Sequence, residues 1–296
     1  MNKLASLSAP MRGAIWMLMA CVFFAVVGIL VRQISKDVHP FEIAFFRALT
    51  VLLIMLLWKG RSLQAMKVQQ LHLHLLRAVS GVIASLLLFS AFAVMPIADV
   101  TALTFTAPLF ATIGAVLFLG ESIHLRRSLG TAVGFVGAMI ILRPGIGDFE
   151  MASLMAIGAA LGMAGSVLTI KGLSRTQSSN AIVFIGALLM APLSLVAAVF
   201  YWTWPTPEQL CWLAAMGTAS FGIQQCITRA FAAADATVIL PFDFSRLLFA
   251  ALLGFVIFGE VPDFWTWIGG TVITVSVVYI ANRESNDAKK SLFKTV

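Results

Sequence analysis

Asp243 and Arg246 are the two residues of this chain whose types and spacing point most clearly to chemistry. They lie three residues apart in PFDFSRLLFAALLGFVIFGE (residues 241–260), a segment that is otherwise almost wholly apolar. A charge at the centre of a membrane helix costs about 2.5–3.5 kcal/mol, and residues three apart on a helix are neighbours that can pair. The pair either orients the helix or presents Arg246 to a substrate carboxylate, phosphate or ring carbonyl, with Asp243 fixing the guanidinium.

Three further polar residues lie inside apolar runs. Arg47 in PFEIAFFRALTVLL follows Glu42 by five residues, a poorer helical spacing for pairing than three or four. It is a candidate substrate contact; a snorkelling or internally paired arginine is the alternative. Gln224 and Gln225 in FGIQQCITRAF need hydrogen-bond partners in the membrane. They either face a cavity or bond to a neighbouring helix.

Motifs of catalysis are missing from the sequence. There is no P-loop, zincin motif or nucleophile elbow, so we expect no catalytic residue, no ATP-driven step and no hydrolytic enzyme. The cysteines are scattered through apolar runs and the histidines lie at their ends, which predicts neither a metal site nor a bound cofactor. These residues are Cys21, Cys211, Cys226, His39, His72, His74 and His124.

The elements that must position these residues are membrane helices. The 296-residue chain is 60% hydrophobic and 11% charged, with a mean hydropathy of +0.97, whereas a soluble domain carries about 25% charged residues. Apolar stretches of about 20 residues, long enough to span a bilayer, recur throughout. The sequence therefore predicts an all-α membrane protein with ten spans, near residues 13–34, 41–58, 73–94, 97–119, 128–143, 151–170, 180–201, 210–231, 236–258 and 264–282.

The net charge of +7 reports orientation in the membrane. Most basic residues between spans fall on one side, and this positive-inside bias predicts cytoplasmic N- and C-termini in a bacterial cytoplasmic membrane. The partner implied is the lipid bilayer, with no nucleic acid, and a homodimer stays open. The side predicted to be cytoplasmic holds Lys3, Arg12, Lys59, Arg61, Lys67, Arg77, Arg126, Arg127, Lys171, Arg175, Arg283, Lys289, Lys290 and Lys294, against Arg32, Lys36 and Arg143 outside.

The second half of the sequence repeats motifs of the first half. ADVTALTFTAPLFATIGAVLFLGE (98–121) and ADATVILPFDFSRLLFAALLGFVIFGE (234–260) share their first and last residues, and a glycine follows nine residues later in each copy, Gly130 and Gly269. A unit of five spans is odd in number, so the second copy must enter the membrane upside down. Inverted repeats are typical of secondary transporters, whose site lies near the midplane between the halves.

Two prolines and two aspartates mark corresponding helices of the repeat. Pro108 and Pro241 interrupt the fourth and ninth spans, and paired interruptions indicate a transport site near a cavity. Asp99 and Asp235 begin the same two spans, and we expect each to cap the first turn of its helix.

These motifs resemble the EamA family of the drug/metabolite transporter superfamily. The resemblance rests on FLGE and FGE after the fourth span of each half, RPG after the fifth, and the glycine-led last span. It implies two inverted five-helix repeats, 13–143 and 151–283, around a central cavity, followed by a polar tail at 284–296. PFDFSRLLFAALLGFVIFGEVPD further resembles branches linked to riboflavin or S-adenosylmethionine.

Three functions follow as hypotheses. The first is a secondary transporter that exports a small metabolite by alternating access, using Arg47, Gln224, Gln225, Asp243 and Arg246. The second is an importer of a cofactor or nucleoside-like compound such as riboflavin or S-adenosylmethionine. The third is a membrane protein without transport activity, a scaffold or a lipid-modifying enzyme. Solute flux into reconstituted vesicles separates transport from the third hypothesis.

Overall fold

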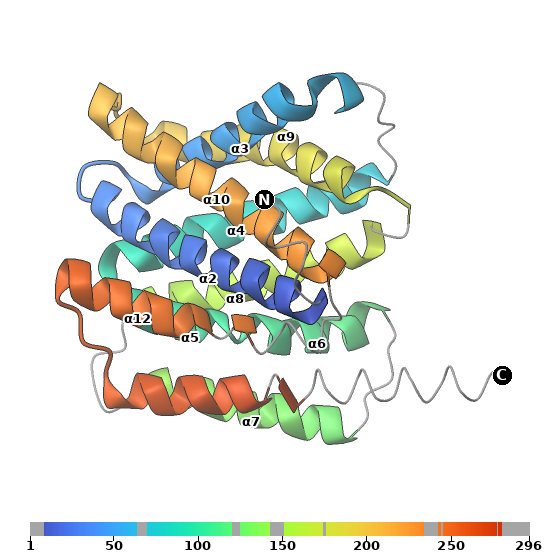
Figure 1. Cartoon of the computed structure of the whole chain (residues 1–296), viewed down its shortest axis with the longest axis vertical. Helices are drawn as coiled ribbons and strands as arrows, with labels where there is room; N and C mark the ends of the chain where they lie inside the picture. The colour runs from blue at the N-terminus through green and yellow to red at the C-terminus, as the bar shows by residue number, and fades with distance from the viewer. Residues whose placement is uncertain are drawn as a thin grey trace.

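The computed structural model describes residues 9–63, 70–119, 125–142, 151–173, 176–233, 242–243, 245–276 and 278–279. These residues are almost entirely helical, with short connections (Figure 1). The labelled helices are α2 (Ala9–Ile34), α3 (Pro40–Leu63), α4 (Leu71–Val94), α5 (Ile97–Thr104), α6 (Ala107–Leu119), α7 (Leu125–Leu142), α8 (Met151–Leu173), α9 (Ser179–Ala198), η1 (Val199–Tyr201), α10 (Pro207–Ala233) and α12 (Ser245–Phe258). Residues 264–276 form a last helix.

Each of the ten predicted spans contains a helix in the described residues. Each corresponds to one helix, except that the fourth is divided between α5 and α6; residues 236–241 of the ninth span and 280–282 of the tenth lie outside the described residues. Six stretches are long and apolar enough to cross a membrane, and 132–141 and 245–258 are shorter apolar helices. Large apolar side chains such as Leu57 and Val196 are exposed on the outside of the bundle, as expected for a surface that faces lipid.

Helices of the first half pack against helices of the second half in matched pairs. The first span, α2, lies along α10 of the second half, and α8, the first span of the second half, lies along α4. Exchanging the two halves converts the first pair into the second. The α3–α10 and α4–α9 contacts are related in the same way, and α3–α9 and α5–α12 are each converted into themselves. This is the arrangement of two inverted five-helix repeats.

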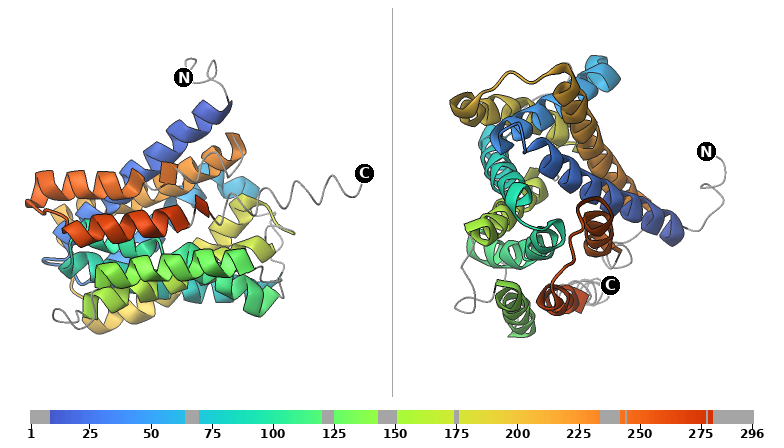
Figure 2. Two further views of the ribbon diagram at one scale, coloured as in Figure 1. Left: turned by 90° about the horizontal axis from the view of Figure 1, so that it is seen from below. Right: turned by 90° about the vertical axis from the view of Figure 1, so that its left-hand side faces the viewer.

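A glycine seam joins the fifth and tenth spans. α7 and the helix at 264–276 lie side by side at one edge of the molecule (Figure 2). A Cβ on Gly269 would lie 2.5 Å from the Gly137 carbonyl oxygen, and the Ser276 hydroxyl donates to the Gly130 carbonyl. The offset of 139 residues that relates Gly130 to Gly269 also relates Gly137 to Ser276. The two contacts are therefore copies of each other.

The chain connections gather at the two ends of the bundle. At one end the Thr203 amide donates to Glu42 Oε1 at 3.1 Å, and the His39 ring stacks on Tyr201 with centroids 3.9 Å apart. We call this the outer end, following the orientation that the basic residues predict. At the other end the Thr176 hydroxyl donates to Gln70 Oε1 at 3.4 Å.

Candidate functional site

Asp243 and Arg246 form an ion pair where the fourth and ninth spans meet. Arg246 Nη2 lies 3.0 Å from Asp243 Oδ2, and the Arg246 and Asp243 side chains are 14% and 27% exposed. The thiol of Cys21 on α2 donates to the Asp243 carbonyl oxygen at 3.6 Å. The pairing follows from the spacing of three residues, and the contact with α2 ties the pair to the first half of the chain.

Two phenylalanine rings flank the Arg246 guanidinium. Its Cζ lies 4.9 Å from the ring centroid of Phe24 and 4.8 Å from that of Phe105. Phe24 belongs to the middle of α2, and Phe105 follows the end of α5. A cation over an aromatic face gains about 0.5–2 kcal/mol, and more when water is removed. The rings and Asp243 together stabilise a charge that the apolar segment alone would disfavour.

The break between α5 and α6 places Phe105 against Arg246. α5 ends at Thr104 and α6 begins at Ala107, and the Thr106 hydroxyl donates to the Leu103 carbonyl at 2.7 Å. Pro108 is the second residue of α6, where a missing N–H leaves no acceptor unsatisfied. Pro241 lies outside the described residues.

The break also corresponds to the charged pair in the repeat. The offset of 139 residues relates Thr104 to Asp243 and Ala107 to Arg246. The charges are therefore present in one half only, and an interrupted helix occupies their place in the other half. Broken helices that meet near the middle of a bundle are where transporters place their substrate sites.

Arg47 lies in a separate environment between α3 and α4. Its Nη2 donates to Ser85 Oγ at 2.7 Å, and its Cζ lies 5.7 Å from the Phe89 ring centroid. Its Nε is buried without a hydrogen-bond partner. Glu42 does not neutralise it, because the Glu42 carboxylate accepts from the amide and hydroxyl of Thr203 at the outer end.

Gln224 and Gln225 lie on α10 away from the ion pair. Gln224 is exposed and Gln225 is half-buried. Gly222, which contacts Phe23 of α2, lies two residues before Gln224, a rotation of about 200° on a helix. Gln224 therefore points away from α2. Within the described part of the chain, neither amide hydrogen-bonds to Asp243, Arg246 or Arg47.

Arg77 is a buried cation that the sequence pattern placed at the cytoplasmic surface. Its side chain is buried, and Nη1 donates to the Ile182 carbonyl at 2.7 Å. Gly186 leaves room for the guanidinium, because a Cβ there would lie 1.7 Å from Arg77 Nη1. Arg77 lies five residues inside the predicted span 73–94 counting from its start at 73, and that depth is the signal that could have identified it.

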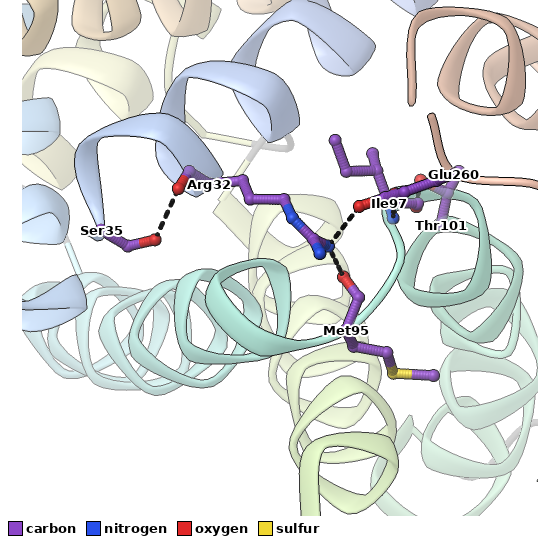
Figure 3. Close-up of polar contacts among 6 residues, drawn as sticks. All are labelled: Arg32, Ser35, Met95, Ile97, Thr101 and Glu260. Atoms are coloured by element: carbon purple, nitrogen blue, oxygen red, sulfur yellow. Dashed lines mark hydrogen bonds and ion pairs between the residues drawn. The ribbon is translucent and has the colours of Figure 1, made fainter. Parts of the chain in front are cut away.

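Arg32 and Glu260 form a second ion pair, at the outer end (Figure 3). Arg32 Nη1 lies 2.7 Å from Glu260 Oε1 and donates to the Met95 carbonyl at 2.7 Å. Glu260 Oε2 accepts from the Ile97 amide at 3.1 Å. Glu260 therefore caps the first turn of α5. Asp99 lies within that first turn and accepts from the Thr266 hydroxyl at 2.7 Å, and Asp235 lies outside the described residues.

The described residues contain no group of three or more histidine, cysteine or acidic side chains that could hold a metal ion. At the Asp243–Arg246 pair the chain offers one guanidinium, one carboxylate and two aromatic faces, groups that suit recognition of a solute.

Comparison with known proteins identifies the architecture. The sequence pattern of the EamA-like transporter family matches residues 11–143 and again residues 150–282. A crystal structure with a TM-score of 0.59 shares 16% of its residues, over 91% of this chain and 96% of that chain, and shows the same fold.

Several named relatives align along almost the whole chain. A riboflavin transporter of Vibrio cholerae is 36% identical over 95% of this chain and 96% of its own length. An S-adenosylmethionine uptake transporter of Rickettsia bellii is 29% identical over 94% and 96%, and the pseudopaline exporter CntI of Pseudomonas aeruginosa is 30% identical over 91% and 95%. Two family matches and ten helices in inverted repeats agree: the chain belongs to the EamA-like transporter family and is a multi-pass membrane transporter.

Proposed function

We propose that this transporter takes up a fused heteroaromatic cofactor of the flavin type through a site at Asp243 and Arg246. The observation that carries the proposal is the Arg246 guanidinium held between Phe24 and Phe105 beside a partly exposed carboxylate. The near full-length similarity to a riboflavin transporter supports the same substrate class, and uptake is the direction named for the Rickettsia relatives.

The chemistry of a flavin matches these groups one by one. Its flat ring system has carbonyl oxygens that accept from a guanidinium fork, an imide N–H that donates to a carboxylate, and faces that stack on phenylalanine. Arg246, Asp243 and Phe105 offer those three partners. A flavin ring that binds beside Phe105 would replace one phenylalanine contact of the Arg246 guanidinium with a contact to the flavin. The guanidinium would then have an aromatic face over it both before and after binding.

The transport cycle proposed here uses the inverted repeat. The two halves rock about their shared interface and expose the site to one side of the membrane at a time. Both termini face the cytoplasm in this arrangement, since ten spans return the chain to the side where it began. Residues 13–143 and 151–283 are the two moving units.

A second candidate is export of a metabolite that bears carboxylates. The observation that favours it is Arg47, a half-buried cation whose Nε is buried without a hydrogen-bond partner and whose Nη2 donates to the neutral hydroxyl of Ser85. A substrate carboxylate would supply the missing charge. The similarity to a pseudopaline exporter supports export as the direction of transport.

The test is transport by purified protein in sealed proteoliposomes. Flavin fluorescence inside the vesicles is followed for the wild type, Arg246→Ala and Arg246→Lys, with Arg229→Ala as a matched control. Arg229 is an exposed arginine whose guanidinium lies over Trp16. We expect saturable flavin uptake that falls at least tenfold in Arg246→Ala, recovers little in Arg246→Lys, and is unchanged in Arg229→Ala.

Three other results decide against the proposal. Flux of a polycarboxylate without flavin flux would favour the second candidate, and its loss in Arg47→Ala would locate the site there. Flavin flux that is equal in Arg246→Ala and the wild type would remove Arg246 from the site. Absence of flux for every solute by a correctly folded protein would favour a scaffold.

A further inference from the structure

We propose that Arg32 and Glu260 form a latch that closes the outer end of the transporter and must open each time the site faces outward. The inference rests on the proposed function only in its use of alternating access; it does not depend on which solute is carried.

The latch joins the two halves through one arginine and one carboxylate. Arg32 Nη1 contacts both Glu260 Oε1 and the Met95 carbonyl, each at 2.7 Å. The other carboxylate oxygen of Glu260 accepts from the Ile97 amide at 3.1 Å. Figure 3 shows Arg32 reaching from α2 toward Met95 and Glu260 at the start of α5. Among the residues labelled there, Glu260 comes from the second half and the others come from the first half.

A glycine turn delivers Glu260 to this position. Gly259 has a φ of 70°, and its amide donates to the Phe255 carbonyl at 2.9 Å, which is the left-handed ending of an α-helix. The turn directs Glu260 back toward α2 and α5. Phe258, the last residue of α12, lies below Arg32, with 5.4 Å from the guanidinium carbon to the ring centroid.

The same three helices connect the latch to the candidate site. α12 carries Arg246 at its start and Glu260 just past its end. α2 carries Phe24 against Arg246, and Arg32 two turns further along. α5 begins at Ile97, which Glu260 caps, and Phe105 follows its end.

The coupling follows from the stiffness of these helices. A solute that separates Phe105 or Phe24 from Arg246 moves α5 or α2 relative to α12. Because each of the three helices ends in a latch contact, the displacement is transmitted to the Arg32–Glu260 pair. The pair is only partly covered, with side chains 24% and 13% exposed, so water can replace the contact when it opens.

The repeat supports a role in the scaffold rather than in recognition. The offset of 139 residues relates Glu260 to Glu121 and Arg32 to Lys171, so the charge types recur in the sequence of the other half. The charges of Asp243 and Arg246 do not recur, since Thr104 and Ala107 stand in their places. Devices that serve both ends of an inverted repeat are expected to be duplicated, and substrate contacts are not.

The experiment measures access to a buried position beneath the latch. Thr101 on α5 is fully buried one turn below Ile97, and Thr101→Cys is introduced after the three native cysteines are replaced (Cys21→Ala, Cys211→Ser, Cys226→Ala). A membrane-impermeant maleimide is then added from outside to intact cells. We expect Glu260→Gln to raise the labelling rate about tenfold, because the amide still accepts from Ile97 while the attraction to Arg32 is lost.

The controls separate the latch from general loosening. Glu208→Gln changes another glutamate at the outer end, whose carboxylate accepts from the Trp212 indole at 3.5 Å, and should leave labelling unchanged. The exchange Arg32→Glu with Glu260→Arg should return labelling toward the starting rate. If Glu260→Gln fails to fold, Arg32→Lys replaces it, and we expect a smaller rise because a single ammonium cannot hold both acceptors.

The outcome is independent of the solute. Labelling that stays flat in a folded Glu260→Gln or Arg32→Lys variant would overturn the latch even if flavin uptake is observed. Labelling that rises and is reversed by the charge exchange would support the latch even if flavin proves not to be carried.

Discussion

Removing the charges of Asp243 and Arg246 one at a time and together separates a structural pair from a substrate site. At 3.0 Å and an effective dielectric constant of about 20, the Coulomb attraction is about 5 kcal/mol. Partial exposure and the hydration lost by both groups reduce its net contribution. We expect Arg246→Gln to destabilise the protein by about 3 kcal/mol, because it leaves a carboxylate unpaired beside two aromatic faces.

The partner variant should be milder. In Asp243→Asn the guanidinium keeps Phe24 and Phe105, each within 5 Å of its carbon, so we expect a loss of about 2 kcal/mol. The double variant should also lose about 2 kcal/mol instead of the sum of about 5, because no charge is stranded. Thermal unfolding in detergent checks this order, at roughly 2 °C per kcal/mol for a chain of this size.

Transport by the double variant decides the interpretation. If the pair recognises the substrate, Asp243→Asn with Arg246→Gln should fold nearly as well as Asp243→Asn alone and still lack flux. A double variant that transports at the wild-type rate would show that the pair only orients α12. If the stability losses of the two single variants add up in the double variant, the argument that an unpaired charge causes the larger loss is refuted.

Four other substitutions test the packing of the fold and its pH dependence. Gly269→Ala should lower the free energy of unfolding by about 2–3 kcal/mol, because its Cβ would lie 2.5 Å from the Gly137 carbonyl oxygen. Gly172→Ala, whose Cβ would meet only a leucine methyl at 3.4 Å, should be neutral or stabilising. Equal losses in the two variants would contradict this account. Gly259→Ala should cost about 1 kcal/mol and speed maleimide labelling beneath the latch, since only φ and not space requires glycine there. Burial lowers the pKa of His39 below 6.5, so the folded protein resists protonation at this residue. The free energy of unfolding should therefore fall as the pH drops from 6.5 through the lower folded pKa, and its slope against pH should be smaller in His39→Gln. An unchanged slope in His39→Gln would show that another group titrates.

The spacing of residues along the sequence predicted the helices and the ion pair between Asp243 and Arg246. The recurring apolar stretches gave all ten helices, and the offset between Gly130 and Gly269 predicted a repeat whose seam has that periodicity. Asp243 and Arg246 pair because three residues apart means adjacent on a helix.

Contacts between distant parts of the chain could not be read from spacing. Phe105 reaches Arg246 from another half of the molecule, and Arg32 is 228 positions from Glu260, the difference between their residue numbers. The carboxylate that accepts from the Ile97 amide at the start of α5 comes from Glu260 in the second half, which no local capping pattern predicts. The burial of Arg77 could not be predicted, because a charge near a span boundary resembles a surface charge until its depth is known.

The seam between α7 and the helix at 264–276 bears on how such a chain can arise. Gly137 meets Gly269, and Ser276 meets Gly130, through contacts that become each other when the halves are exchanged. A surface with that property is isologous, so one half-length protein could have bound a second copy of itself inserted in the opposite sense. Fusion of two such genes would preserve the interface and leave each copy free to diverge. Once two separate copies exist, one copy can acquire charges, such as those at 243 and 246, that the other lacks.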